Sequence, residues 1–344
     1  MGSNVALFEE RLSNFFGREA VCVSTGTSAL QLALQACDIG VGHEVIVPSL
    51  TYVASFQAIA ATGAVPVAAE VREDSLTLDP DDVEGRITGR TRAIMPVHYG
   101  GGIAALPEIY ALARTHGLRV IEDAAHSFGG SSNGDRFGSV GDISCFSFDP
   151  IKNITAGDGG AVVSGDPEVL QRVRDIRLLG VKGDSEARKK ERRLYEFDVV
   201  EQGWRYHMNN INAAIGLTQL GQLESISAHR RFIAHTYNRA FEMSPHVLRL
   251  PWNYDEIVPH IYVIRLPSID KRNQVRVSLK EVLGVETALH WYPNHLLTRF
   301  RNDSTSFSVT EKSFETMVTI PLHSGVTEEN ALEIAAHINA SVAQ

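Results

Sequence analysis

Seven short apolar runs, separated by longer segments, dominate the first half of this 344-residue chain. Polar and apolar residues rarely alternate within these runs, which is typical of strands that are buried on both faces of a sheet. The runs occupy residues 20–24, 44–48, 65–70, 91–97, 119–122, 143–147 and 160–164. Helical periodicity fills several of the gaps, at residues 28–37, 51–61 and 105–116. Strands separated by helices of this length predict an α/β fold: a mainly parallel sheet with helices on both faces.

The last third of the chain has a different pattern. A helical segment at 210–223 continues after a break to about residue 240. Beyond it we expect strands at 261–266 and 286–290, a helix at 275–283 and a closing helix at 328–343. These elements predict a large domain with an N-terminal helix (1–225) and a smaller C-terminal α+β domain (226–344). The charged stretch 182–202 fits either a solvated loop or a functional loop near an anionic substrate.

Composition excludes several classes of protein. The net charge of −9 argues against a nucleic-acid surface. The cysteines Cys22, Cys37 and Cys145 are too far apart to suggest a zinc site or a disulfide framework. No signal-peptide pattern and no apolar run of roughly 18 residues is visible, so we expect a cytoplasmic protein that does not associate with membranes.

A candidate phosphate site lies between the first strand and the first of these helices, at residues 24–30. Gly26 permits a tight turn, after which the backbone N–H groups of Thr27 and Ser28 begin a helix. Helix N-termini bind phosphate through such donors, and the two hydroxyls add more. A plain helix cap by Thr25 or Thr27 is the alternative.

An acid and a lysine follow two other strands. Asp123 would lie at the carboxyl edge of the sheet, where ligands of open α/β folds gather. Lys152 stands between the apolar residues Ile151 and Ile154, which would lower its pKa. The pair suits a cofactor whose aldehyde condenses with an amine and whose ring nitrogen needs a counter-anion. The alternatives are that Asp123 caps the next element and that Lys152 is a surface residue.

Three further residues are expected at the same edge. His126 could bind a ring substituent, and Ser147 could donate to a phosphate. Tyr52 follows a strand and could stack on a flat ring, although packing in the core explains it equally well.

Together these residues resemble the DegT/DnrJ/EryC1/StrS family of sugar aminotransferases, which are fold-type I pyridoxal phosphate enzymes. The resemblance covers nearly the whole chain. Its motifs lie at residues 24–30, 48–54, 96–101, 122–126, 146–153, 157–161, 212–220 and 321–323.

The resemblance implies a role for each candidate. Lys152 would form an imine with pyridoxal 5'-phosphate and shuttle a proton, and Asp123 would pair with the ring nitrogen. His126 stands where the family often has Gln or His near the phenolic oxygen, and Tyr52 would stack on the ring. The phosphate would be held by Thr27, Ser28 and Ser147.

Two positions depart from the family pattern. Arg205 replaces an Asn that reaches the phosphate of the neighbouring subunit, and His207 replaces an Arg. Because arginine also binds phosphate, the resemblance implies a homodimer whose active site is shared and completed by Arg205. Glu70 stands where the family usually has Asp, and we interpret it as structural.

Lys152 also selects the reaction, since related dehydratases have histidine at that position. The resemblance implies transfer of an amino group from L-glutamate, through pyridoxamine phosphate, to a keto-sugar, without a metal. The expected acceptor is a nucleotide-linked 3- or 4-keto-6-deoxy sugar, in amino-sugar biosynthesis for surface polysaccharide or a secondary metabolite. A keto-sugar without a nucleotide, or a cyclitol ketone, is the alternative. Tyr292 and His295 would approach the substrate, unless they only pack at a strand end.

Two other functions fit the sequence less well. A nicotinamide oxidoreductase would need G-x-G-x-x-G after the first strand, and residues 24–30 lack that spacing. A regulatory protein that only binds pyridoxal phosphate would not need Lys152, and no basic DNA-binding segment is apparent.

Overall fold

A seven-stranded sheet forms the centre of the larger part of the protein. The computed structural model describes residues 2–183, 196–301 and 305–343. The strands, in sheet order, are β1 (Ala20–Val23), β9 (Gly160–Ser164), β8 (Ile143–Ser147), β5 (Arg119–Asp123), β4 (Thr91–Ile94), β2 (Glu44–Pro48) and β3 (Val65–Ala69). Six of these strands run in the same direction, and β9 runs opposite to them between β1 and β8. The predicted strands and the mainly parallel sheet are therefore confirmed.

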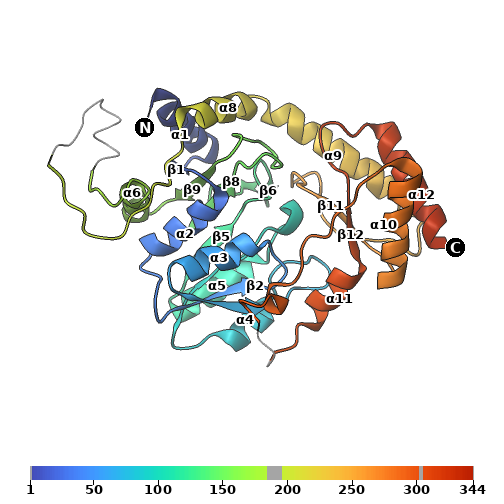
Figure 1. The fold of residues 1–344 in the computed structure, drawn as a ribbon, viewed down its shortest axis with the longest axis horizontal. Helices are drawn as coiled ribbons and strands as arrows, with labels where there is room; N and C mark the ends of the chain where they lie inside the picture. The colour runs from blue at the N-terminus through green and yellow to red at the C-terminus, as the bar shows by residue number, and fades with distance from the viewer. Residues whose placement is uncertain (1, 184–195, 302–304, 344) are drawn as a thin grey trace.

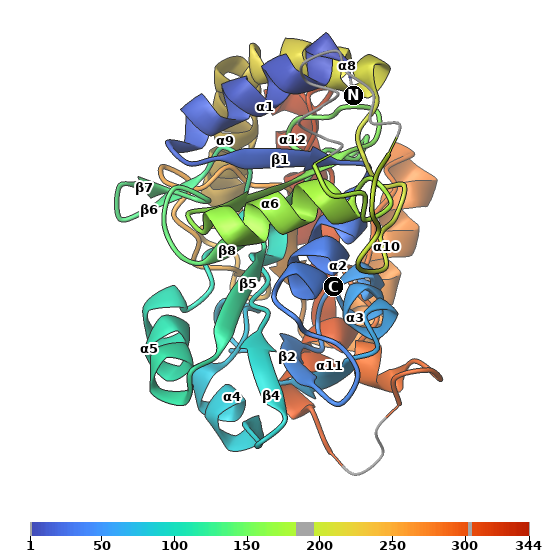
Figure 2. The ribbon, with the colours of Figure 1, turned by 90° about the vertical axis from the view of Figure 1, so that its left-hand side faces the viewer.

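Helices cover both faces of this sheet (Figures 1 and 2). One face packs against α2 (Gly26–Ala36), α3 (Val53–Ala61) and α6 (Pro167–Ile176). The other face packs against α4 (Pro80–Arg86), α5 (Leu106–His116), α1 (Ser3–Phe16) and α8 (Asn210–Leu220). Because both faces of the sheet are covered, all five residues of each of the strands β2, β8 and β9 are buried, as expected from their mainly apolar sequences.

The C-terminal part is built on a small antiparallel sheet. Its strands are β10 (Leu248–Arg249), β11 (Tyr262–Arg265) and β12 (Met317–Ile320). Its helices are α9 (Leu223–Ala240), α10 (Ile269–Leu283), α11 (Ser308–Thr316) and α12 (Glu328–Ala343), drawn from yellow to red in Figure 1. None of the helices in the described part of the chain is long and apolar enough to cross a membrane.

Two expectations for this part were wrong. Residues 286–290 do not form a strand: Ala288 alone pairs with Thr319, because the chain then leaves the small sheet. The third strand of that sheet is β12, which was not predicted.

Helix α10 begins six residues before the predicted start at 275, because the Ser268 hydroxyl caps it by accepting the N–H of Lys271. Residues 184–195 of the charged stretch lie outside the described residues.

The two parts share one apolar core. A single cluster joins Phe8 and Phe148 of the larger part to Tyr262 and Ile264 of the smaller part. Helix α9 begins at Leu223, beside the predicted division at 225, and the division itself stays a prediction.

Glu70 also joins the two parts. Its carboxylate accepts the backbone N–H groups of Val309 and Thr310, at 3.0 and 2.9 Å, and the hydroxyl of Thr310. Negative charge at a helix N-terminus is favourable, so Glu70 stabilises the start of α11. This contact agrees with the structural interpretation of Glu70.

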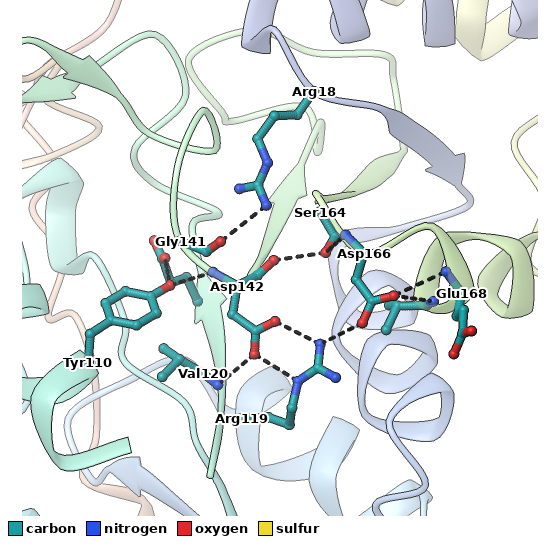
Figure 3. Close-up of polar contacts among 11 residues, drawn as sticks. Arg18, Tyr110, Arg119, Val120, Gly141, Asp142, Ser164, Asp166 and Glu168 are labelled. Carbon is teal, nitrogen blue, oxygen red and sulfur yellow. Dashed lines mark hydrogen bonds and ion pairs between the residues drawn. The ribbon is translucent and has the colours of Figure 1, made fainter. Parts of the chain in front are cut away.

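A polar network fastens the sheet at the end opposite the carboxyl edge (Figure 3). The Asp142 carboxylate binds the Arg119 guanidinium through two contacts of 2.7 and 2.8 Å and accepts the N–H of Val120. Arg119 also reaches Asp166, which caps α6. The start of β5, the start of β8 and α6 are thus held in one arrangement.

We expect Asp142→Ala to lower the free energy of unfolding by about 1–3 kcal/mol, because it leaves Arg119 and the Val120 N–H without their main partner. Urea unfolding measures the change. Asp255→Ala is the matched control, since it removes an exposed carboxylate paired with His235 and should cost less than about 1 kcal/mol. Equal losses in the two variants would contradict the structural role of this network.

Candidate active site

A cavity of about 370 Å³ opens at the carboxyl edge of the large sheet. Six of the predicted site residues line it: Thr27, Tyr52, Asp123, His126, Ser147 and Lys152. They come from the ends of different strands and from the first turns of helices, which is where ligands of open α/β sheets bind. The structure therefore brings most of the predicted site together.

The start of α2 forms one end of the cavity. Thr25 and Ser28 cap this helix reciprocally: the Thr25 hydroxyl accepts the Ser28 N–H at 3.0 Å, and the Ser28 hydroxyl accepts the Thr25 N–H at 2.9 Å. Ser28 is buried in this cap and does not line the cavity, so its phosphate contact stays a prediction. Thr27 and Ser147 do line the cavity and can offer hydroxyls to an anion beside the helix N-terminus.

Gly26 allows α2 to start directly against β8. A Cβ atom at this position would lie 2.7 Å from the Cβ of Ser147, which is too close for any other residue without a shift. The glycine therefore places the Ser147 hydroxyl beside the first turn of α2 and keeps the anion site compact.

Asp123 is held in one orientation. The Ser55 hydroxyl donates to its Oδ2 at 2.8 Å, and the Ala125 N–H donates to its Oδ1 at 3.2 Å. Burial raises the pKa of Asp123, while these hydrogen bonds and the nearby Lys152 charge oppose the rise. Ser55 was missed from the sequence; its place one turn into a helix that follows a strand end was the available signal.

Lys152 places a primary amine in the lining of the cavity. Burial lowers its pKa from 10.5 to about 8, and the Asp123 and Asp149 carboxylates only partly oppose this. Its ammonium group donates no hydrogen bond to the residues that the structure describes. Of the two predicted apolar neighbours, Ile154 is buried, but Ile151 is 65% exposed and gives little shielding. The walls of the cavity therefore supply most of the partial shielding of the amine.

Tyr52 stands at the mouth of the cavity and is 56% exposed, so the core-packing explanation is wrong. Its ring centroid lies 6.0 Å from that of Trp291. An exposed aromatic face at the mouth of a cavity can cover a flat ligand.

His290 and Trp291 line the cavity but were not predicted. The sequence indicated their neighbours instead. Tyr292 is 51% exposed and packs against Phe314, while His295 is buried and bonded to Ser49 and Glu311. Neither Tyr292 nor His295 lines the cavity, so their contact with substrate stays a prediction.

Arg205 lies outside the cavity on the exposed surface. It forms no ion pair with the described residues, and its backbone pairs with Leu178. A role across a subunit interface remains a prediction for this residue.

These residues fit pyridoxal phosphate. A half-buried amine without a hydrogen-bond partner in the described chain faces the same cavity as an oriented carboxylate, and a helix N-terminus with hydroxyls closes one end. Fold and cavity together define a fold-type I pyridoxal phosphate-dependent aminotransferase.

Comparison with known proteins gives the family. The model of the DegT/DnrJ/EryC1/StrS aminotransferase family matches residues 1–339, and the chain belongs to that family. Its cofactor is pyridoxal phosphate.

Solved structures similar to this chain include DesV of S. venezuelae in complex with a ketimine intermediate. That match has 33% identity and a TM-score of 0.91, and covers 100% of this chain and 90% of DesV. Helicobacter pylori PseC, an aminotransferase involved in the biosynthesis of pseudoaminic acid, matches at 26% identity and a TM-score of 0.91, covering 100% and 92%. NtdA of Bacillus subtilis, solved with bound PMP, matches at 26% identity and a TM-score of 0.87, covering 99% and 78%.

The lowered pKa of Lys152 predicts its reactivity in the cofactor-free protein. Only the neutral amine is a nucleophile, so the rate of labelling by an amine-reactive reagent should rise about tenfold per pH unit and level off above about pH 8. Ordinary exposed lysines should continue to gain rate to about pH 10. Peptide mass spectrometry measures both in one sample.

Asp123→Asn is the matched variant for this measurement. It removes a carboxylate that favours the charged form of Lys152, so the midpoint should move to lower pH. A midpoint near 10 in the parent protein, or an upward move in the variant, would contradict the described environment of the lysine.

Proposed function

We propose that the protein transfers the amino group of L-glutamate to a keto-sugar, and that this sugar is a nucleotide-linked 3- or 4-keto-6-deoxy sugar. The observation that carries the proposal is Lys152, a shielded amine of lowered pKa that shares its cavity with Asp123. The family and the relative described as working in pseudoaminic acid biosynthesis support a sugar as acceptor. The proposal that the acceptor sugar is linked to a nucleotide depends on the resemblance of the sequence motifs to those of the family.

The pathway would supply an amino sugar for surface polysaccharide or for a secondary metabolite. The cytoplasmic location expected from the sequence is part of the same proposal.

Each of the main residues of the cavity has a separate proposed role. Bound pyridoxal phosphate supplies an aldehyde that condenses with amines and a ring that withdraws electrons from the attached carbon. Lys152 Nζ gives up a proton near pH 8, so it can attack as a neutral amine and later carry a proton to and from the substrate carbon. Asp123, oriented by Ser55, would stabilise positive charge on a ring nitrogen. Thr27 and Ser147 would hold the phosphate together with the start of α2.

Lys152→Ala should lower the rate of amino transfer by a factor of about 10² to 10⁴, because it removes the proton carrier. The rate of glutamate-dependent change in the cofactor absorbance measures this. Lys280→Ala, which removes an exposed lysine on α10, is the matched control and should keep the parental rate. An unchanged rate in Lys152→Ala would end the proposed mechanism.

The acceptor is tested by incubating the protein with glutamate and a panel of ketones, with mass spectrometry of the products. We expect amination of 3- or 4-keto-6-deoxy sugars linked to a nucleotide. If only free keto-sugars or cyclitol ketones were aminated, the proposal of a nucleotide-linked acceptor would be wrong, while the proposal of transamination would stand.

Arg205 is proposed to reach the cofactor phosphate of a second copy of this chain. Arg205→Glu should weaken binding of pyridoxal phosphate by at least about tenfold, since it places a negative charge near a phosphate. Fluorescence titration measures the affinity, and Arg92→Glu, at an exposed position of β4, is the control. A fully active monomer in sedimentation at the assay concentration would contradict the shared site.

A further inference from the structure

The ring of His126 is sandwiched between two other rings. One face stacks on His260, with centroids 4.3 Å apart and planes 24° apart. The other face stacks on Trp291, at 5.0 Å and 20°. His126 follows β5 of the larger part, whereas both stacking partners belong to the C-terminal part. The C-terminal part therefore holds this ring in one plane from both sides.

The backbone of Gly100 fixes which nitrogen of His126 carries the proton. The Gly100 N–H donates to His126 Nδ1 at 3.2 Å. A nitrogen that accepts a hydrogen bond carries no proton, so a neutral His126 has its proton on Nε2. Because Nε2 forms no hydrogen bond within the described chain and His126 lines the cavity, this N–H is available to a bound ligand.

The same glycine also holds His260. The Gly100 carbonyl accepts the backbone N–H of His260 at 2.8 Å, so one residue bonds both the ring of His126 and the backbone of His260. Gly100 has φ +63°, and a Cβ atom there would lie 2.4 Å from the Trp252 ring. Only glycine fits this close approach without a shift.

Arg230 of α9 fixes His260 from the opposite side. Its guanidinium donates to the carbonyls of His260 and Leu322 at 3.1 and 3.0 Å. His260 is buried, and its Nδ1 has no hydrogen-bond partner in the described part of the chain. The backbone of His260 is therefore anchored, while its ring serves mainly as a flat surface against His126.

The surroundings keep His126 uncharged. Burial lowers its pKa well below the usual value, and the positive charge of Lys152 acts in the same direction. His260 is affected in the same way by burial, Lys152 and Arg230. A charged donor is thus disfavoured at neutral pH.

We propose that His260 and Trp291 are positioning residues that hold His126 as a neutral Nε2–H donor aimed at an oxygen acceptor in the cavity. His126 would then act as a fixed donor and not as a general base. That the acceptor belongs to the bound cofactor or to its substrate rests on the proposed function. The tautomer of His126 is inferred from geometry alone. The same holds for its clamp, by which we mean the stacking of its ring between His260 and Trp291.

Nitrogen NMR of cofactor-free protein labelled at histidine tests the tautomer directly. His126→Gln identifies the signals by their loss. In the parent protein we expect an unprotonated Nδ1, a protonated Nε2 and no titration between pH 6 and 8. A protonated Nδ1, or a titration within that range, would overturn the proposal without touching the assignment of substrate.

Three variants test the clamp. His260→Ala should free the ring, giving mixed tautomers, binding of pyridoxal phosphate weakened roughly tenfold and a changed pH midpoint of the absorbance of the holoenzyme. His260→Phe keeps a flat ring and should restore the His126 signals. Leu279→Ala, a buried truncation in α10 outside this stack, controls for lost stability and should leave those signals unchanged. Parental His126 signals in His260→Ala, or altered signals in His260→Phe, would overturn the clamp.

Discussion

The partial burial of the Lys152 amine in the cavity is the constraint on which the rest of the site depends. An ammonium group in contact with water holds its proton until about pH 10, so its neutral, nucleophilic fraction near neutral pH is very small. Burial in the cavity brings its pKa to about 8, and the Asp123 carboxylate in the same cavity keeps it from falling further. The sheet supports this balance because β5 and β8 are paired in parallel and present their carboxyl ends to the same side. The remaining residues orient a ligand around these two groups.

Much of the larger part could be predicted from its sequence. Buried parallel strands are continuous apolar runs, and each of the predicted runs forms a strand in the structure. Residues that directly follow such strands, such as Asp123 and Ser147, could be placed at the cavity because chain direction determines where a strand ends. The identity of the family followed from the order of these motifs.

The C-terminal part was less predictable, for physical reasons that differ from residue to residue. The run 286–290 was predicted as a strand, but the chain turns toward the cavity after Ala288, so Trp291 lines it and Tyr292 does not. Which of two adjacent aromatic residues faces inward depends on tertiary packing, which no local pattern encodes. His260 lies in an apolar stretch like any core residue, and only the stacking on His126 distinguishes it.

Lys152 and Trp291 belong to parts of the chain that are made at different times during synthesis. The ribosome completes the lysine, the aspartate and the start of α2 before the C-terminal part exists, and at that stage nothing from that part can exclude water from the cavity. His290 and Trp291 close the same cavity only when the last third of the chain folds back over it. The newly made larger part therefore lacks two of the side chains that line the cavity around Lys152, and the enclosure of this amine is completed last.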